Sequence, residues 1–264
     1  LARSLVGPEM CIRDSFRENT EHRPIPGSSE VQEPVQYDNT QFLLWHSENT
    51  FNYQWPGKIL FACSHPAEQG GETPFVDNRT MYQQLDQAVR DEFERKGVMY
   101  VRRYLKQDML GLGWKTIFST EDKDVVEQKC QQQKMSAEWR ENDVLITRAV
   151  RSAVWKHPET LQTCWVNQAQ HWHFSCLPVE TRNSFIALYD PEDFARNCYF
   201  GDGSPIGDNT MAYILAQYEK FQVYQPWQRG DFVMADNLLV AHARRPFQGE
   251  RKLMVCLGDM VQFS

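Results

Sequence analysis

A histidine and a glutamate two residues apart, His46 and Glu48, end a predicted strand in the segment Trp45-His46-Ser47-Glu48. Side chains two apart in an extended chain point to the same side, so the imidazole and the carboxylate can face one point. A distant histidine on another predicted strand, His242, would complete a set of two histidines and one carboxylate. Such a set occupies three positions of an octahedral Fe(II) ion and leaves three for other ligands. The spacing alone is weak evidence, because His and Glu two apart are commonplace on protein surfaces.

A second histidine pair, His171 and His173, flanks Trp172 and offers a competing metal site. With a distant acid this pair would resemble a cupin-like centre, although a histidine satisfied inside a core or pocket is the commoner fate. Two further histidines, His65 and His157, each precede a proline. We expect both of them at turns and exposed.

Several longer phrases surround the candidate ligands and carry a family resemblance. They follow one another along the chain as PAEQGGETPFVDNR, HPETLQTCWVNQ, YFGDGSPI and PWQRGDFVMADNLLVAHARRPFQGERK. With them, residues 41–260 resemble the TauD/TfdA-like family of Fe(II)- and 2-oxoglutarate-dependent dioxygenases, and look closest to its syringomycin-biosynthesis hydroxylase-like branch. The order of these phrases is far more specific than the His-x-Glu spacing.

This resemblance implies two cofactors and the residues that hold them. It implies that His46, Glu48 and His242 bind Fe(II), and that Thr73 and Arg251 bind 2-oxoglutarate. A guanidinium suits the distal carboxylate of 2-oxoglutarate, because a buried anion requires a charged partner with good geometry. The implied reaction uses O2, converts 2-oxoglutarate to succinate and CO2, and oxidises a substrate C–H bond.

The carboxylate ligand narrows the reaction type. Related halogenases lack it so that chloride can bind, so Glu48 favours hydroxylation. Desaturation or epoxidation of a similar substrate is the alternative among enzymes. A metal-binding jelly-roll protein without turnover is the alternative from another class.

One departure from the family pattern concerns the substrate. Several family members carry a second arginine, four residues after the cosubstrate arginine, that grips an acidic group of the substrate; here that position is Val255. Taurine is therefore not expected. We expect an amino acid, or an aminoacyl group tethered to a carrier protein, as substrate in specialised metabolism.

Other side chains are candidates for substrate contact. Asn167, with Gln168 beside it, either contacts substrate or makes hydrogen bonds inside the sheet. Four arginines that alternate with apolar residues either replace the missing clamp or form solvated strand faces: Arg102, Arg103, Arg148 and Arg151.

The candidate site residues must be positioned by strands, and the sequence contains many short apolar and aromatic runs that end at turn residues. Such runs predict strands at 42–46, 59–64, 73–76, 98–104, 144–149, 153–156, 163–166, 232–235, 238–242 and 253–257. Many short strands favour a sandwich or barrel. We therefore predict a mainly β fold, a distorted double-stranded β-helix (jelly roll) with helical insertions, as the resemblance also implies.

Three helices interrupt the predicted strands. Residues 87–96 form one, with Asp86 as its cap and Gly97 at its left-handed end. A second begins at Ser119 or Thr120. A third follows Asp208 or Asn209 and aligns apolar side chains on one face at helical spacing: Met211, Ile214, Leu215 and Tyr218. The eight tryptophans are expected in the core of the sandwich rather than at a carbohydrate site.

The composition limits the classes of protein to which this chain can belong. The 264 residues carry a net charge of −7, which argues against nucleic-acid binding, and no apolar run is long enough for a membrane span. Seven scattered cysteines without a C-x-x-C pair favour a reducing cytoplasm, with Cys63, Cys164 and Cys256 as inert buried thiols. We expect residues 1–15 to be a non-native scar, 16–40 an N-terminal arm and 41–264 a single dioxygenase domain.

Overall fold

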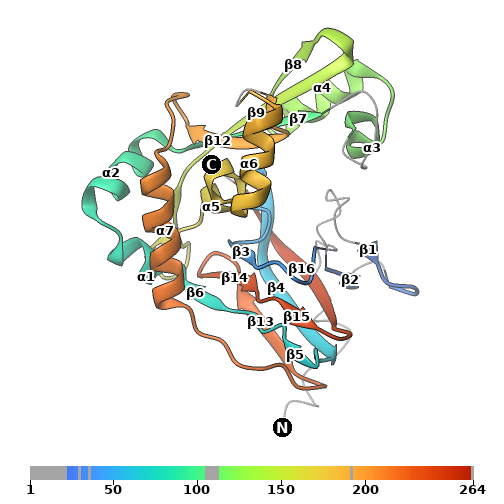
Figure 1. The fold of residues 1–264 in the computed structure, drawn as a ribbon, viewed down its shortest axis with the longest axis vertical. Helices are drawn as coiled ribbons and strands as arrows, with labels where there is room; N and C mark the ends of the chain where they lie inside the picture. The colour runs from blue at the N-terminus through green and yellow to red at the C-terminus, as the bar shows by residue number, and fades with distance from the viewer. Residues whose placement is uncertain (1–22, 29–30, 35–36, 105–112, 191–192, 263–264) are drawn as a thin grey trace.

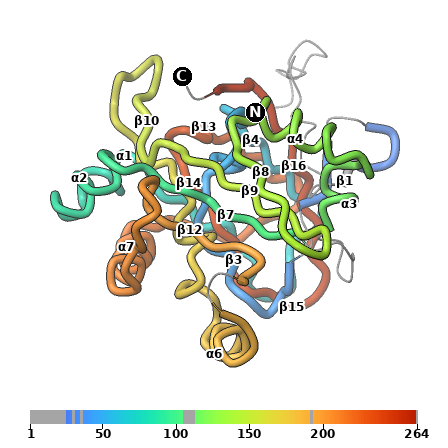
Figure 2. Tube along the Cα trace, turned by 90° about the horizontal axis from the view of Figure 1, so that it is seen from above, coloured from blue at the N-terminus to red at the C-terminus, as the bar shows by residue number. Residues whose placement is uncertain are grey.

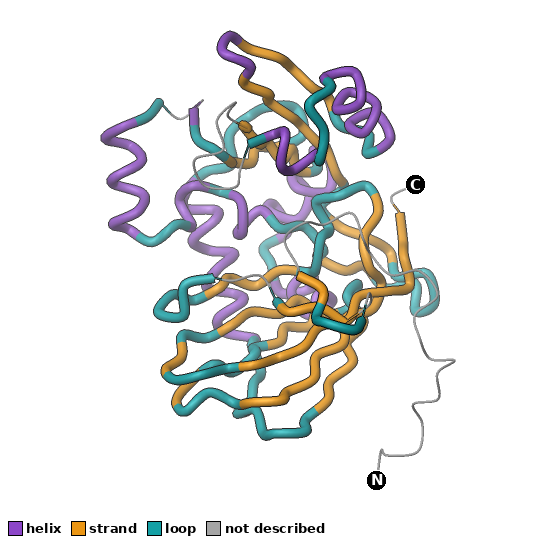
Figure 3. The backbone as a smooth tube through the Cα atoms, turned by 90° about the vertical axis from the view of Figure 1, so that its right-hand side faces the viewer, coloured by secondary structure: helices purple, strands orange, loops and turns teal. Residues whose placement is uncertain are grey.

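The protein is mainly β, with helices grouped beside its strands (Figure 1). The computed structural model describes residues 23–28, 31–34, 37–104, 113–190 and 193–262. The proposed scar, residues 1–15, lies outside the described residues. Figure 3 shows most strands stacked in one half of the molecule and most helices in the other. Among the described residues, no helix is long and apolar enough to cross a bilayer.

The largest sheet has five strands in the order β1-β2-β16-β4-β13. These strands span Arg23–Pro24, Val31–Glu33, Lys252–Gln262, Gln54–His65 and Phe232–Asp236. The long strand β4 alternates its burial, so that Ile59, Phe61 and Cys63 point into a core shared with β16. The segment 16–40, expected as an arm with little core, supplies β1 and β2, and β2 pairs with β16.

A smaller sheet, in the order β3-β14-β6, carries the candidate metal ligands. Its strands are Leu43–His46, Val240–Arg244 and Phe75–Asp77. A two-stranded sheet extends the same region through β5, Gln69–Gly70, and β15, Phe247–Gln248.

A four-stranded antiparallel sheet, in the order β12-β7-β9-β8, lies at the opposite end of the molecule in Figure 1. Its strands are Arg196–Phe200, Val98–Tyr104, Val144–Arg151 and Ser136–Arg140. Two helices, α3 at Trp114–Phe118 and α4 at Lys123–Gln132, pack beside it through a small core that includes Trp114, Val126 and Leu145. Strands β10, Val154–Lys156, and β11, Thr163–Trp165, form a separate hairpin.

The remaining helices lie beside the sheets. Helices α1, α2 and α7 run beside one another in Figure 1 and span Asn78–Gln84, Gln87–Lys96 and Asp208–Phe221. Helix α7 buries Met211, Ile214 and Tyr218 in the largest core cluster. Short elements complete the fold: α5 at Ala169–Trp172, α6 at Val179–Leu188, and the 3-10 turns η2 at Glu141–Asp143 and η3 at Phe174–Cys176. Seen from above, α6 lies at the edge of the molecule (Figure 2).

The ten predicted strands are all present, while several helix details differ from the prediction. Helix α2 has the predicted bounds and ends at Gly97 with φ of 67°, but the Asp86 side chain makes no capping hydrogen bond. Helix α4 begins at Lys123, capped by Asp122; Ser119 instead ends α3 in a left-handed conformation. The described cysteines are all free, with Cys63 and Cys164 buried and Cys256 half-buried.

His157 was expected to be exposed at a turn, and this prediction is wrong. The residue is only 3% exposed. Its Nδ1 accepts hydrogen bonds from the backbone N–H groups of Glu159 and Thr160, so Nε2 carries the proton and faces the Asp236 carboxylate at 3.3 Å. The turn is present, but the interaction with the Asp236 carboxylate, from a distant part of the sequence, keeps the His157 ring buried. His65 is exposed, as predicted.

Asp236 makes the stability of this region depend on pH. Burial alone raises the pKa of Asp236, but hydrogen bonds from Lys58 and His157 outweigh it and hold the pKa below its ordinary value. Such a carboxylate contributes stability that is present above its unfolded pKa and lost as the pH falls through the folded pKa. We predict that Asp236→Asn lowers the free energy of unfolding at neutral pH, and that the difference from wild type shrinks below about pH 4. Urea unfolding at several pH values measures both effects, with exposed Asp91→Asn as control; a difference independent of pH would contradict this assignment.

Candidate active site

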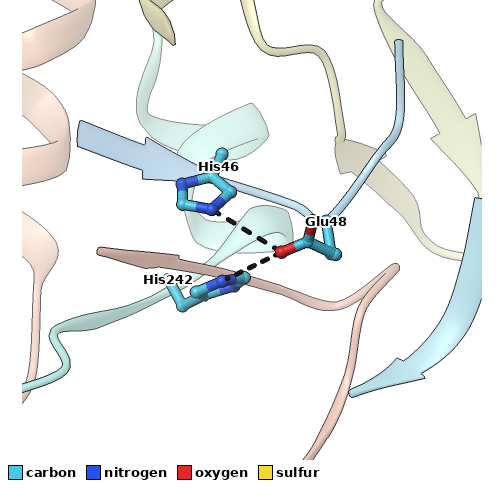
Figure 4. A group of neighbouring side chains, drawn as sticks. All are labelled: His46, Glu48 and His242. Atoms are coloured by element: carbon cyan, nitrogen blue, oxygen red, sulfur yellow. Dashed lines mark ion pairs between the residues drawn. The ribbon is translucent and has the colours of Figure 1, made fainter. Parts of the chain in front are cut away.

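Three predicted ligands meet at one end of the small β3-β14-β6 sheet (Figure 4). His46 and His242 are directly paired residues of the antiparallel strands β3 and β14, so their side chains leave the same face. Their ring centroids lie 4.3 Å apart. The Glu48 carboxylate oxygen Oε2 lies 3.7 Å from Nε2 of His46 and 3.6 Å from Nε2 of His242. The ligand atoms of the three residues all lie within 4.8 Å of one another.

The position of Glu48 differs in detail from the sequence argument. Strand β3 ends at His46, and Glu48 lies in the following turn rather than in extended chain. Asn49, the next residue, has a φ of 59°, which is unusual outside glycine. The carboxylate therefore reaches the two imidazoles through a turn, and the backbone of that turn has to be held in place.

Four buried amide side chains hold this turn. Asn237 accepts a hydrogen bond from Glu48 N at 2.6 Å and donates to Glu48 O at 2.9 Å, so it fixes both backbone groups of the ligand. Gln168 donates to Ser47 O, and Gln170 donates to Trp45 O at 2.6 Å. Asn78 donates to the Ser47 hydroxyl at 3.0 Å. Each of these four side chains is at most 2% exposed, and together they restrict where the carboxylate can point.

The proton on the His46 ring is assigned by its partner. Nδ1 of His46 lies 2.7 Å from the carbonyl oxygen of Leu44, which can only accept. In the neutral ring the proton therefore sits on Nδ1, and the lone pair of Nε2 faces Glu48 and His242. This is the usual way in which a second hydrogen bond orients a metal-binding histidine.

His171 adds a third imidazole beside this group, with its ring centroid 4.9 Å from that of His46. Burial, followed by the charges of His46 and Arg196, lowers the pKa of His171 well below its ordinary value. His173, its partner in the alternative metal site, faces away: its Nε2 bonds to Ile206 O and its Nδ1 to Ser175. The two rings of that motif thus point to different parts of the molecule. His173 is a buried histidine whose two ring nitrogens are both hydrogen-bonded within the chain.

Thr73 and Arg251 form a second polar group near the ligands. Arg251 donates from Nε to Gly71 O at 2.9 Å and from Nη2 to the Thr73 hydroxyl at 3.3 Å. Trp227 donates to the same hydroxyl at 2.9 Å. Burial and then the charge of Arg244 lower the pKa of Arg251 to about 10, which leaves it charged at neutral pH. No carboxylate among the described residues forms an ion pair with Arg251.

Gly71 allows this arrangement. Its φ is +73°, and a Cβ there would lie 3.0 Å from Cδ and 3.1 Å from Nε of Arg251. The Gly70-Gly71 turn therefore brings backbone against the guanidinium stem where a side chain would push it away.

A cavity of about 570 Å³ joins the two groups. Its lining includes the three candidate ligands, Thr73 and Arg251, together with apolar side chains from several elements: Phe51, Phe61, Trp172, Phe174, Phe185 and Val255. A cavity of this size suits a small molecule. Gln168 lines it, whereas Asn167 does not. The Asn167 amide donates to Ala153 O and accepts from Ala169 N, which is the structural alternative considered for it.

The four candidate arginines separate into two pairs. Arg102 and Arg103 line the cavity. Arg148 instead pairs with Glu138, and Arg151 is 4% exposed, donating to the carbonyls of Phe51, Gln133, Lys134 and Val150. The prediction that Arg151 is either a clamp or part of a solvated face is therefore wrong, because its charge is buried among backbone oxygens.

The comparisons with known proteins identify the family of the chain. Residues 3–257 match the model of the family described as "Taurine catabolism dioxygenase TauD, TfdA family". The chain belongs to this family, and it is a 2-oxoglutarate-dependent dioxygenase with Fe(II) and 2-oxoglutarate as cofactors.

Two curated relatives are similar over most of this chain. It is 36% identical over 231 residues to the dapdiamide synthesis protein DdaC of Enterobacter agglomerans, covering 88% of this chain and 70% of that protein. It is 30% identical over 230 residues to a clavaminate synthase-like protein of Arabidopsis thaliana, covering 82% of this chain and 65% of that one. Among solved structures, a taurine dioxygenase from Burkholderia xenovorans aligns with a TM-score of 0.48 and 16% identity, over 93% of this chain and 72% of that one.

Asn237 provides a test of how the turn is positioned. We predict that Asn237→Ala weakens Fe(II) binding by about 10- to 100-fold, because the Glu48 backbone loses both of its side-chain partners. Anaerobic titration with Fe(II) measures the affinity. The matched control is Asn197→Ala, which removes another buried amide that bonds to backbone groups away from the ligands. Equal losses in the two variants would mean that Asn237 supports the fold in general and not the ligand.

Proposed function

We propose that this protein hydroxylates an amino acid or a carrier-tethered aminoacyl substrate in specialised metabolism, with His46, Glu48 and His242 holding Fe(II). The observation that carries this proposal is the convergence of two imidazole nitrogens and a carboxylate within 4.8 Å on the wall of a cavity that also contains a buried arginine. Two nitrogen donors and one carboxylate are the donor set expected for a non-haem Fe(II) site. The residues present therefore fit the metal that the family uses.

We also propose how the sheets combine into one fold. The five-stranded sheet lines the cavity through Ile59 and Leu253, and the small sheet with β3 and β14 lines it through His46 and His242. We propose that these strands form the two sides of a distorted double-stranded β-helix, open at the end where the ligands lie.

Thr73 and Arg251 are proposed to bind 2-oxoglutarate. The Thr73 oxygen already accepts from Trp227 and Arg251, so its own proton is available for an incoming carboxylate. The Arg251 guanidinium supplies the matching charge inside a partly apolar cavity, where an anion without a partner would be costly. Gly71 O fixes the guanidinium at Nε and leaves its terminal nitrogens directed toward Thr73 and the cavity.

Bound Fe(II) and 2-oxoglutarate supply the oxidative chemistry, with succinate and CO2 as the fate of the cosubstrate. The side chains and backbone of the protein position the residues that would surround Fe(II) and 2-oxoglutarate. The Leu44 carbonyl keeps the His46 lone pair directed at the metal position, and Asn237 keeps Glu48 there. The aromatic lining, which includes Phe51, Phe61 and Trp172, restricts water next to the substrate. Because Glu48 supplies the carboxylate that related halogenases lack, the position that a halide would take there is filled, which supports hydroxylation over halogenation.

The substrate assignment has separate support. The similarity to a protein named for dapdiamide synthesis favours specialised metabolism. Val255, 2% exposed on β16, lines the cavity where several family members have a substrate-binding arginine, so a taurine-like contact is not available from that strand.

The metal assignment predicts a spectroscopic result. Anaerobic addition of Fe(II) and 2-oxoglutarate to the wild type should produce a visible metal-to-ligand charge-transfer band, and His46→Ala should abolish it because one of three protein ligands is lost. Exposed His65→Ala should retain the band. A colourless wild type would reject the triad. When O2 is then admitted with candidate substrates, product mass separates gain of oxygen from the loss of two hydrogens that desaturation would give.

The cosubstrate assignment predicts a different phenotype. Arg251→Ala should retain Fe(II) affinity but weaken 2-oxoglutarate binding by about 100-fold or more, because the distal carboxylate loses its charged partner. Titration of the charge-transfer band with 2-oxoglutarate measures this, and Fe(II) binding alone is the internal control. Unchanged affinity for 2-oxoglutarate in the variant would refute the role of Arg251.

A further inference from the structure

His171 lines the cavity without belonging to either of the groups assigned so far. It is not part of the set His46, Glu48 and His242, whose ligand atoms lie within 4.8 Å of one another. Its ring centroid nevertheless lies 4.9 Å from that of His46, so it adjoins the position proposed for Fe(II). His171 is therefore a polar ring beside the metal group that a bound molecule can contact.

The position of His171 is fixed by both of its neighbours in the short helix α5. Gln170 donates to Trp45 O at 2.6 Å, and Trp172 packs against Phe51 with ring centroids 5.1 Å apart. Both neighbours are buried, whereas His171 is half-buried. Helix α5 is thus anchored through the residues on either side of His171 and presents this imidazole to the cavity.

The two ring nitrogens of His171 have different surroundings. Nδ1 is buried, and no described residue offers it a hydrogen-bond partner. Nε2 is not enclosed in this way, so it is the ring nitrogen that meets the cavity. A buried N–H without an acceptor is rarer in proteins than a buried acceptor without a donor. We therefore place the proton of the neutral ring on Nε2, where it is a donor directed at a molecule in the cavity.

The chain from α5 to α6 forms an apolar wall next to this donor. Arg182, a polar residue of the same stretch, already donates to Ser175 O at 3.3 Å. In largely apolar pockets, a small number of placed polar groups fix the orientation of the ligand. The apolar side chains that this stretch contributes to the cavity are Trp172, Phe174, Leu177 and Phe185.

The cosubstrate group comes from other parts of the chain. Thr73 precedes β6 and Arg251 precedes β16, whereas His171 belongs to α5. The cavity of about 570 Å³ has a volume typical of sites for drug-sized molecules, and 2-oxoglutarate alone is smaller than these. A cosubstrate held by Thr73 and Arg251 therefore leaves room in the same cavity for a second small molecule that contacts His171.

We propose that Nε2 of His171 donates a hydrogen bond to a carboxylate or carbonyl oxygen of the substrate and so holds its oxidisable carbon beside the metal group. The inference rests on the proposed oxygenase function and narrows its substrate to an amino acid with an apolar side chain, free or as a thioester. That side chain packs along Trp172 and Phe174. The carboxylate of the free acid and the carbonyl of the thioester offer the same kind of acceptor, and the experiment below distinguishes them.

The test compares ligands with and without this acceptor on the protein loaded anaerobically with Fe(II) and 2-oxoglutarate. The probes are L-valine, L-leucine, L-isoleucine and L-phenylalanine, each as free acid, as N-acetylcysteamine thioester and as the amine that lacks the carboxyl group. The change in the charge-transfer band and the shift of the thermal unfolding midpoint measure binding. At least one acid or thioester should bind more tightly than its amine. His171→Leu should weaken binding of that probe by about 10- to 100-fold and leave binding of the amine nearly unchanged.

Two further variants separate hydrogen bonding from packing. His171→Gln can place an amide N–H near the position of Nε2 and should recover part of the affinity that His171→Leu loses. Phe174→Leu is the matched control, because it removes apolar surface from the same wall but no donor, and it should weaken the acid and the amine alike. Both His171 variants should still form the charge-transfer band, since His171 belongs to neither cofactor group.

The proposal is overturned if no acid or thioester binds more tightly than its amine, or if His171→Leu and Phe174→Leu change the ratio of acid to amine affinity alike. Loss of the charge-transfer band in His171→Leu would also overturn it, because His171 would then act on a cofactor. Tighter binding of the free acid identifies the carboxylate as the acceptor, and tighter binding of the thioester identifies the carbonyl.

Failure of the proposed function is distinguishable from these outcomes. In that case the charge-transfer band is absent in wild type. The shifts of the unfolding midpoint still show whether the difference between acid and amine depends on His171.

Discussion

The close approach of three electron-pair donors, two imidazole nitrogens and a carboxylate oxygen, is the constraint on which the rest of the structure depends. Without restraint from the fold, two imidazoles and a carboxylate would each point toward water or toward a separate hydrogen-bond donor. Here the antiparallel pairing of His46 with His242 fixes two of them on one face of a sheet. The third, Glu48, comes from a turn, and a turn is easier to distort than a strand.

The amides around that turn are the means by which it is kept in place. Asn237 binds both the N–H and the carbonyl of Glu48, so movement of the ligand would break two buried hydrogen bonds at once. A buried amide or backbone group left without a partner costs about 1–3 kcal/mol, which is a large penalty against rearrangement. The rigidity of the site therefore comes from polar groups outside the ligand set. They act before any metal is bound, because their partners all belong to the chain.

The sequence indicates the candidate metal ligands, but it gives little sign of the side chains that support them. His46, Glu48 and His242 can be found from residue type and from the phrases around them, and the apolar runs locate every predicted strand. Asn237 cannot be found in this way, because Asp236-Asn237 reads as an ordinary turn. Strands β8 and β12 contain many polar residues, so their sequences lack the alternation of apolar and polar residues that identifies a strand. His157 and Arg151 were placed wrongly for a related reason: each is drawn inward by oxygen atoms from distant segments, and local pattern does not report such partners.

The charge of Arg251 in the cavity fits the proposed binding of 2-oxoglutarate. Arg251 is half-buried and no carboxylate among the described residues forms an ion pair with it, so the distal carboxylate of a bound 2-oxoglutarate would supply the opposite charge. Thr73 and Arg251 line the same cavity as the candidate metal ligands, so one small molecule can contact both groups.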